Sequence, residues 1–269
     1  MSLEVFKFPT GEVHCKAQLI INNIIRIPMM PNVNDWLMAN VLACDAYARL
    51  LDGDDKFDLF MPYLPYSRQD RPTSQREPFS LSKVGKILND LPCRRIFTLD
   101  VHSDVAFGCI PKLVNISKVF TLFPEPDEIL VVPDQGAYKR LGHYMGRYKS
   151  HAIAIKSRDT ETGKLTLVEV VGEVKDKVCV IIDDICDGGG TFIMLADELY
   201  RRGAKEVRLI VTHGVFSKGI KVLNDAKIMH ITTTDSFNQI EQAAHYPGFT
   251  IPKVMKCNNI LKEFLKQDA

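Results

Sequence analysis

The chain has 269 residues, of which 46% are hydrophobic and 25% are charged, which is the composition of a globular protein with a sizeable core. Its formal net charge of +1 provides no field that would hold DNA, RNA or an anionic membrane. The seven cysteines are odd in number and form no CxxC pair, which indicates free thiols in a reducing compartment. We find no signal peptide and no apolar run of membrane-spanning length. These features predict a cytoplasmic protein without nucleic-acid or membrane partners.

Strands and helices are predicted to alternate along almost the whole chain. In the first half, hydrophobic periodicity predicts the order strand 19–27, helix 35–51, strand 57–64, helix 80–91 and strand 96–99. In the second half, apolar runs predict strands at 129–132, 152–155, 178–182 and 207–211. A helix that stops near Gly146 is predicted after the turn 133–136, and another helix after the glycine turn that follows Ile182. This alternation predicts an α/β fold of mainly parallel sheets flanked by helices.

The segment 112–128 contains two prolines and is the best candidate for a domain boundary. We therefore predict two α/β domains, over 1–115 and 116–255, and a C-terminal helix near 256–268 as a candidate to pack on the N-terminal domain. The polar stretch 157–166 contains a glycine and is predicted to be a mobile loop.

Polar clusters follow most of the predicted strands. They come after Leu64, Leu99, Val132, Ile155 and Ile182. In parallel sheets, ligands bind beyond the carboxyl ends of the strands, so these clusters are expected to gather where a ligand would lie. The pattern favours an enzyme over a structural protein.

The stretch Val178–Phe192, which reads VCVIIDDICDGGGTF, carries the most specific chemistry. Asp183 and Asp184 follow a buried strand, and a turn then leads into a helix through Asp187, Gly188, Gly189, Gly190 and Thr191. Glycines let the backbone pass close to a ligand, and the start of a helix offers unpaired N–H groups to a phosphate. The carboxylate pair suits sugar hydroxyls or a divalent cation, because it would repel a phosphate. We predict a site for a phosphorylated sugar; the plainer alternative is a turn in which Asp187 or Thr191 caps the helix.

The segment IIDDICDGGGT resembles the phosphoribosyl-binding signature shared by type I phosphoribosyltransferases and ribose-phosphate diphosphokinases. A second segment, MPYLPYSRQDR, is similar to one found in the diphosphokinases and absent from the transferases. The resemblance implies that Arg68, Gln69 and Arg71 bind ATP. Without it, an isolated RQDR would be as well explained as a solvated charged loop. A third segment, FPTGEV, resembles the adenine-contacting turn of the diphosphokinases, which implies that Phe8 and Glu12 bind the base, although Thr10 replaces the usual Asp.

Three shorter segments complete the resemblance. TLDVHS implies that His102 contacts the nucleotide, its phosphates or Mg²⁺, and VPDQG implies that Asp134 is a metal-associated carboxylate. KSR implies that Lys156 and Arg158 stabilise the phosphoryl group in transit, as charged residues do in phosphoryl transfer. On chemistry alone, a histidine after a strand is more often structural, since Mg²⁺ prefers oxygen ligands, and two cations at the edge of a loop are often only solvated.

Together the segments identify the chain as resembling a ribose-phosphate diphosphokinase with two phosphoribosyltransferase-like domains. The resemblance implies transfer of the diphosphoryl group of Mg-ATP to the 1-hydroxyl of ribose 5-phosphate, in a homo-oligomer that we expect to be a dimer, with a hexamer as the larger alternative. The resemblance begins late in the family's order of secondary-structure elements, so we expect the first strand and helix of the family to be missing from this chain. The alternatives are a type I phosphoribosyltransferase and a non-catalytic regulatory homologue.

Overall fold

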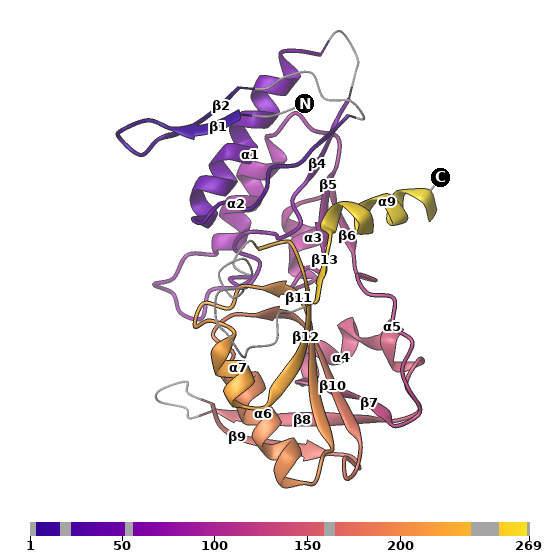
Figure 1. Ribbon diagram of the computed structural model, residues 1–269. Helices are drawn as coiled ribbons and strands as arrows, with labels where there is room; N and C mark the ends of the chain where they lie inside the picture. Colours follow the sequence, from indigo (N-terminus) through magenta and orange to yellow (C-terminus); the bar gives the residue numbers. More distant parts are fainter. Residues whose placement is uncertain (1–3, 17–22, 52–55, 159–164, 238–252, 268–269) are drawn as a thin grey trace. The chain divides into compact units, whose positions relative to one another are not determined.

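The computed structural model describes residues 4–16, 23–51, 56–158, 165–237 and 253–267, which belong to two compact units (Figure 1). The first unit is Met1–Ser117 and the second is Lys118–Ala269. Each unit has its own sheet. The predicted α/β class with mainly parallel sheets is confirmed.

The first unit contains a four-stranded parallel sheet in the order β3-β4-β5-β6 and a separate antiparallel hairpin, β1–β2. Its strands are β1 (Glu4–Lys7), β2 (Val13–Lys16), β3 (Ile24–Ile25), β4 (Asp58–Phe60), β5 (Ile96–Leu99) and β6 (Leu113–Ile116). Its helices are α1 (Val33–Ala48), α2 (Ser80–Asn89) and α3 (Val105–Cys109). The strand predicted over 19–27 lies partly outside the described residues, and β6 was not predicted.

Helix α1 starts where the sequence offers a cap. Asn32 Oδ1 accepts hydrogen bonds from the N–H groups of Asn34 and Asp35 at 2.8 and 3.3 Å, which satisfies two donors that the first turn leaves unpaired. Trp36 is buried and donates its indole N–H to the carbonyl of Ile27 at 3.0 Å, which ties the helix to the chain after β3. Helix α1 is thus tied to the segment that follows the carboxyl end of β3.

The second unit contains a seven-stranded sheet in the order β13-β12-β11-β10-β7-β8-β9, parallel throughout except for the β8–β9 pair. The strands are β7 (Glu128–Val132), β8 (His151–Arg158), β9 (Leu165–Val171), β10 (Val178–Cys186), β11 (Glu206–Gly214), β12 (Ile228–Thr234) and β13 (Lys253–Met255). The helices are α4 (Gln135–Arg140), α5 (Gly142–Met145), α6 (Gly190–Arg201), α7 (Lys221–Asp225) and α9 (Cys257–Gln267). Of the predicted loop 157–166, residues 157–158 and 165–166 lie in strands, and 159–164 lie outside the described residues.

The core of the second unit lies mainly between α6 and one face of the sheet. Alternate residues of the central strands, such as Ile129, Ile181 and Leu209, are fully or almost fully buried in one cluster with Leu195 and Leu199 of α6. The alternation follows from the two-residue period of a strand, and the helical spacing of the leucines places them on one side of α6. Figure 1 shows α6 and α7 on one side of this sheet and α4 and α5 on the other.

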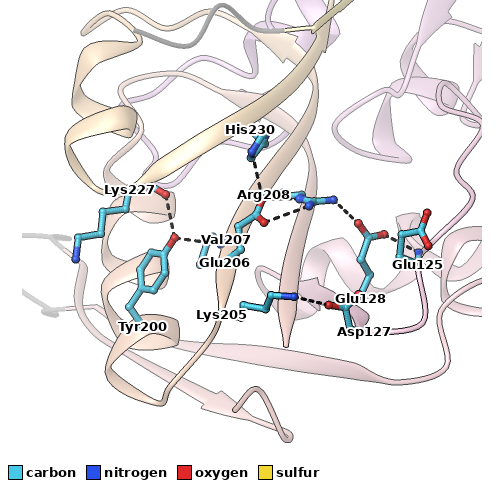
Figure 2. A network of polar contacts seen from close by, with 10 residues as sticks. All are labelled: Glu125, Asp127, Glu128, Tyr200, Lys205, Glu206, Val207, Arg208, Lys227 and His230. Carbon is cyan, nitrogen blue, oxygen red and sulfur yellow. Dashed lines mark hydrogen bonds and ion pairs between the residues drawn. The ribbon is translucent and has the colours of Figure 1, made fainter. Parts of the chain in front are cut away.

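The amino ends of the central strands carry a network of ion pairs (Figure 2). Arg208 of β11 donates to Glu206 Oε1 at 2.6 Å and pairs with Glu128 at the start of β7, across the intervening strand β10. His230 Nε2 lies 3.5 Å from Glu206, and Lys205 Nζ lies 3.0 Å from Asp127. These contacts join β7, β11 and β12 at the amino ends of the strands. The turns that carry the sequence motifs lie at the opposite, carboxyl ends of the strands.

None of the described helices is long and apolar enough to cross a membrane. All seven cysteines are free thiols, as predicted, and six of them are buried.

Candidate active site

Strand β10 is longer than predicted and carries both aspartates of the central motif. Its parallel pairing with β11 continues past Ile182, through Asp183↔Val211 and on to Cys186↔Gly214. Asp183 and Asp184 are therefore held in strand geometry and both are buried. Their positions are set by the sheet rather than by a loop.

Arg140, the last residue of α4, lies between these two carboxylates. Its guanidinium donates to Asp183 Oδ1 at 2.7 Å and forms an ion pair with Asp184. The side chains are only 19%, 11% and 3% exposed, in the order Arg140, Asp183 and Asp184. Burial and the neighbouring charge of Asp184 nevertheless raise the pKa of Asp183 to about 8, because one cation compensates only part of the pair. An electron-rich, buried acid pair of this kind can accept hydrogen bonds from the hydroxyls of a sugar.

The glycine turn, residues 187–190, leads into α6 through a glycine N-cap. The N-cap is Gly189, which has a left-handed φ of 78° and no side chain to accept a hydrogen bond. The N-cap residue of α6 is therefore neither Asp187 nor Thr191. A Cβ at Gly189 would also stand 2.9 Å from Leu223 Cδ2, so both the backbone angle and the space require glycine at this position. The start of a helix offers N–H groups that have no partner within the helix, which suits a bound anion.

A second turn, after β11, packs beside the glycine turn. The N–H groups of Val215 and Phe216 donate to the carbonyl of Cys186 at 2.9 and 3.0 Å. The Phe216 ring lies over Gly214, where a Cβ would come within 2.2 Å of it. His213 is buried, and its Nδ1 lies 2.9 Å from Ser236 Oγ, so within this turn its role is structural.

Asp134 follows β7 and begins α4. Its Oδ1 accepts a hydrogen bond from the N–H of Ala137 at 2.8 Å, which makes it the N-cap of the helix. Asp134 thus positions α4, and through α4 it positions Arg140. Strand β7 is the direct neighbour of β10, so the Asp134 turn and the acid pair come from adjacent strands.

In the first unit, the turns after β4 and β5 are joined around Asp70. Arg71 donates two hydrogen bonds to the Asp70 carboxylate, at 3.0 and 2.8 Å. Arg71 lowers the pKa of Asp70 to about 2 against the effect of burial, and the Ser103 hydroxyl and the charge of His102 act in the same direction. The structure therefore brings the RQDR segment and the His102 turn together, and Asp70, which the sequence analysis did not select, links them.

Three of the motif turns contain a non-glycine residue with a left-handed backbone. These are Tyr66 after β4 with φ 61°, Asp100 after β5 with φ 42°, and Phe216 after β11 with φ 46°. Such angles cost free energy and persist where the surrounding structure holds them, often at functional sites. All three follow the carboxyl end of a parallel strand, where ligands of such sheets bind.

The predicted adenine contacts lie at the tip of the β1–β2 hairpin. The N–H of Phe8 donates to the carbonyl of Glu12 at 2.9 Å, Thr10 Oγ1 donates to the Glu12 carboxylate at 2.7 Å, and the exposed Phe8 ring stacks on His14. In Figure 1 the hairpin tip projects away from the rest of its unit. Within the described part of this unit, the structure does not bring Phe8 and Glu12 to the Asp70 turn.

Lys156 and Arg158 lie in the last three residues of β8, paired with β9 on one side of the strand. Their backbone positions follow from the sheet, whereas their side chains lie outside what the structure describes. Lys156 is therefore placed at the carboxyl end of β8, beside β7 and its Asp134 turn, by strand register alone.

Comparison with known proteins places these features in one family. The family model "N-terminal domain of ribose phosphate pyrophosphokinase" matches residues 1–91, and the model "Phosphoribosyl transferase domain" matches residues 127–247. The chain is 30% identical over 230 residues to a ribose-phosphate pyrophosphokinase of Clostridium tetani, covering 80% of this chain and 71% of that protein. A relative of the same name from Streptomyces avermitilis is 30% identical over 250 residues, covering 87% of this chain and 76% of that protein.

The chain belongs to the ribose-phosphate pyrophosphokinase family. A crystal structure of phosphoribosylpyrophosphate synthetase from Mycobacterium smegmatis superposes with a TM-score of 0.79 at 25% identity and covers 99% of this chain and 90% of that one. Pyrophosphokinase is the other name of the diphosphokinases, so the predicted family and enzyme class are confirmed. The match over residues 1–91 decides against a type I phosphoribosyltransferase, because the transferase model covers only 127–247.

Arg140 was not predicted from the sequence as a residue of the site. Asp183 and Asp184 were recognised as a pair, and a buried pair of carboxylates needs a nearby cation. The available signal was Arg140 itself, at the end of a short helix that starts from the predicted Asp134 turn. Nothing in the spacing alone connects it to residues more than forty positions further along the chain.

Proposed function

We propose that this protein transfers the diphosphoryl group of Mg-ATP to the 1-hydroxyl of ribose 5-phosphate, giving phosphoribosyl diphosphate and AMP. The observation that carries the assignment of the sugar side is the turn 187–190, which starts α6 at a glycine N-cap next to the buried pair Asp183 and Asp184. Backbone N–H groups of Gly188, Gly189, Gly190 and Thr191 would hold the 5-phosphate, with Asp187 at the edge of the turn. Asp183 and Asp184 would accept hydrogen bonds from the ribose hydroxyls.

The nucleotide side rests on the first unit. Arg68, Gln69 and Arg71 would bind ATP with His102, and Phe8 and Glu12 would contact the adenine. Arginine suits phosphate oxygens because its planar fork donates two parallel hydrogen bonds. The link from Asp70 to Arg71 and Ser103 supports this grouping, since it keeps the two turns that carry these residues together.

The described residues fit magnesium bound mainly through substrate. Among them, no group of three or more His, Cys, Asp or Glu side chains could hold a metal ion without further ligands. Mg²⁺ commonly uses one or two carboxylates together with phosphate oxygens, so the partly buried carboxylate of Asp134 is a suitable ligand and His102 a less usual one. When bound, the ion would neutralise negative charge on the phosphates of ATP.

No protein nucleophile is needed for this reaction. The 1-hydroxyl of the sugar attacks the β-phosphorus of ATP and AMP leaves, so catalysis depends on alignment and on stabilising the charge of the group in transit. Lys156 and Arg158 would supply that stabilisation from the end of β8. We further propose a homo-oligomer, a dimer in the first instance, in the cytoplasm, where the seven free thiols would stay reduced.

The test is AMP release from Mg-ATP, measured in a coupled assay with and without ribose 5-phosphate. We expect release that depends on the sugar phosphate and is lost in Lys156→Ala. The control variant is Lys205→Ala, whose side chain pairs with Asp127 at the amino end of the sheet and should leave the rate unchanged. If no nucleoside triphosphate releases its monophosphate, the proposal fails. Release with a triphosphate other than ATP would correct the nucleotide and direct attention to Thr10.

A further inference from the structure

One lysine beside the glycine turn has no part in the function proposed above. Lys218 follows the turn after β11, and its methylene groups lie across Gly188. A Cβ on Gly188 would stand 3.3 Å from Lys218 Cε and 3.4 Å from Lys218 Cδ. Lys218 is exposed, and within the part of the chain that the structure describes its ammonium group has no hydrogen-bond or ion-pair partner.

The position of this side chain is set by the fold. Two N–H groups of the turn before it donate to the carbonyl of Cys186, and the N–H of Ser217 donates to the carbonyl of Asp187 at 3.2 Å. The residue directly before Lys218 is therefore hydrogen-bonded to the residue directly before Gly188. The ammonium nitrogen is one bond beyond Cε, so it stands within reach of a ligand held by the glycine turn.

The charges around the turn call for a cation there. A phosphomonoester carries about −1.5 to −2 charges at pH 7, and the backbone N–H groups of the turn are neutral. Three aspartates, Asp183, Asp184 and Asp187, lie along the same segment, and Arg140 is bound between the first two. A phosphate entering the turn lies near these carboxylates, and a cation beside it would offset their repulsion.

We propose that Lys218 binds the 5-phosphate of the sugar substrate through its ammonium group and thereby sets the preference of this site for phosphorylated over unphosphorylated ribose. The inference rests on the proposed function only in placing the phosphate in the glycine turn. Lys218 is a binding residue and not a catalytic one, because the 5-phosphate is at the opposite end of the sugar from the reacting 1-hydroxyl. Its loss should therefore act on KM for the sugar phosphate rather than on kcat or on KM for Mg-ATP.

The experiment compares Lys218→Ala and Lys218→Arg with a matched control, Lys175→Ala. Lys175 covers a glycine in the same way at the amino end of the sheet, where a Cβ on Gly203 would stand 3.3 Å from Lys175 Cγ. Binding of ribose 5-phosphate is measured by calorimetry without ATP, and KM values are measured with ATP. Lys218→Ala should weaken binding and raise KM for the sugar phosphate about tenfold, the size of one charge-assisted hydrogen bond, while Lys218→Arg keeps most of the affinity.

Two outcomes would overturn this inference. One is wild-type affinity for ribose 5-phosphate in Lys218→Ala, and the other is an equal loss in Lys175→Ala. The calorimetric measurement also separates this inference from the proposed function. Sugar phosphate binding that depends on Lys218, in a protein that releases no AMP, would support the binding role while the proposed reaction fails. A wild-type protein that does not bind ribose 5-phosphate at all would refute both.

Discussion

The replacement Arg140→Ala tests the electrostatics of the sugar side most directly. It removes the cation between two carboxylates that are almost completely buried. Breaking a buried ion pair by deleting one partner typically costs about 3–5 kcal/mol, because a charge is left uncompensated. Arg140 is partly exposed and the acid pair can take up a proton, so we expect the lower end, about 3 kcal/mol at pH 8.

The loss should depend on pH, with a defined sign. The pKa of Asp183 is already raised to about 8 in the folded state, so its contribution to stability is present below the pKa of the unfolded chain and is lost as the pH rises towards 8. Without Arg140 the acid pair holds protons more tightly, and ionisation at high pH costs more. We therefore expect Arg140→Ala to be destabilised less at pH 5.5 than at pH 8.

Urea unfolding followed by far-UV circular dichroism at both pH values measures this effect. The control is Arg201→Ala, which removes an exposed arginine paired with Glu198 within α6 and should cost at most about 1 kcal/mol. Fluorescence of Trp36, the single tryptophan, reports on the first unit and helps to assign the transition. If Arg140→Ala cost no more than Arg201→Ala, or cost the same at both pH values, the argument from a compensating cation would be refuted.

Three further predictions concern single residues of the second unit. Gly189→Ala should lower the free energy of unfolding by about 2 kcal/mol, because Gly189 has a left-handed φ and a Cβ there would contact Leu223. Gly190→Ala places its Cβ in open space and should leave the free energy of unfolding unchanged or slightly raised. Thermal unfolding of both variants checks this. Asp134→Ser should retain the helix cap and lose the metal-associated carboxylate, so its unfolding midpoint should stay near wild type while the Mg²⁺ dependence of AMP release shifts to higher concentration. Arg208→Ala should cost about 1–2 kcal/mol in urea unfolding without changing KM for either substrate, because its ion pairs lie at the amino ends of the strands.

Local pattern was sufficient to predict the elements whose own residues define them. Helix α6 buries Phe192, Leu195, Ala196 and Leu199, which recur in the sequence at the spacing of one helical face, so local pattern predicts this helix. The family resemblance likewise rested on contiguous segments, which the structure places at the ends of strands or in the turns that follow them. Such features depend on residues close together in the chain, so a sequence contains the information directly.

Features set by distant residues could not be predicted in this way. Strand β10 extends through Asp183 and Asp184 because β11 continues to pair with it, and β9 exists as an antiparallel partner of β8. The pairing of Arg140 with both aspartates depends on how α4 meets the sheet. In each case a tertiary contact, and not local propensity, decides the outcome.

The two ends of the second unit's sheet differ in how they treat charge and backbone strain. At the amino ends, Arg208 and its partners satisfy one another and join strands β7 and β11 across β10. At the carboxyl ends, the acid pair is only partly compensated, and Gly189 and Phe216 hold left-handed backbone angles. Features that cost stability are retained where function needs them, so stabilising changes at the carboxyl ends should lower activity. Replacing Asp183 with Asn tests this: it removes a carboxylate whose ionisation is unfavourable, so we expect a higher unfolding midpoint at pH 8 together with weaker binding of ribose 5-phosphate. A variant that gained stability and kept full affinity would show that the buried charge is not held there for the substrate.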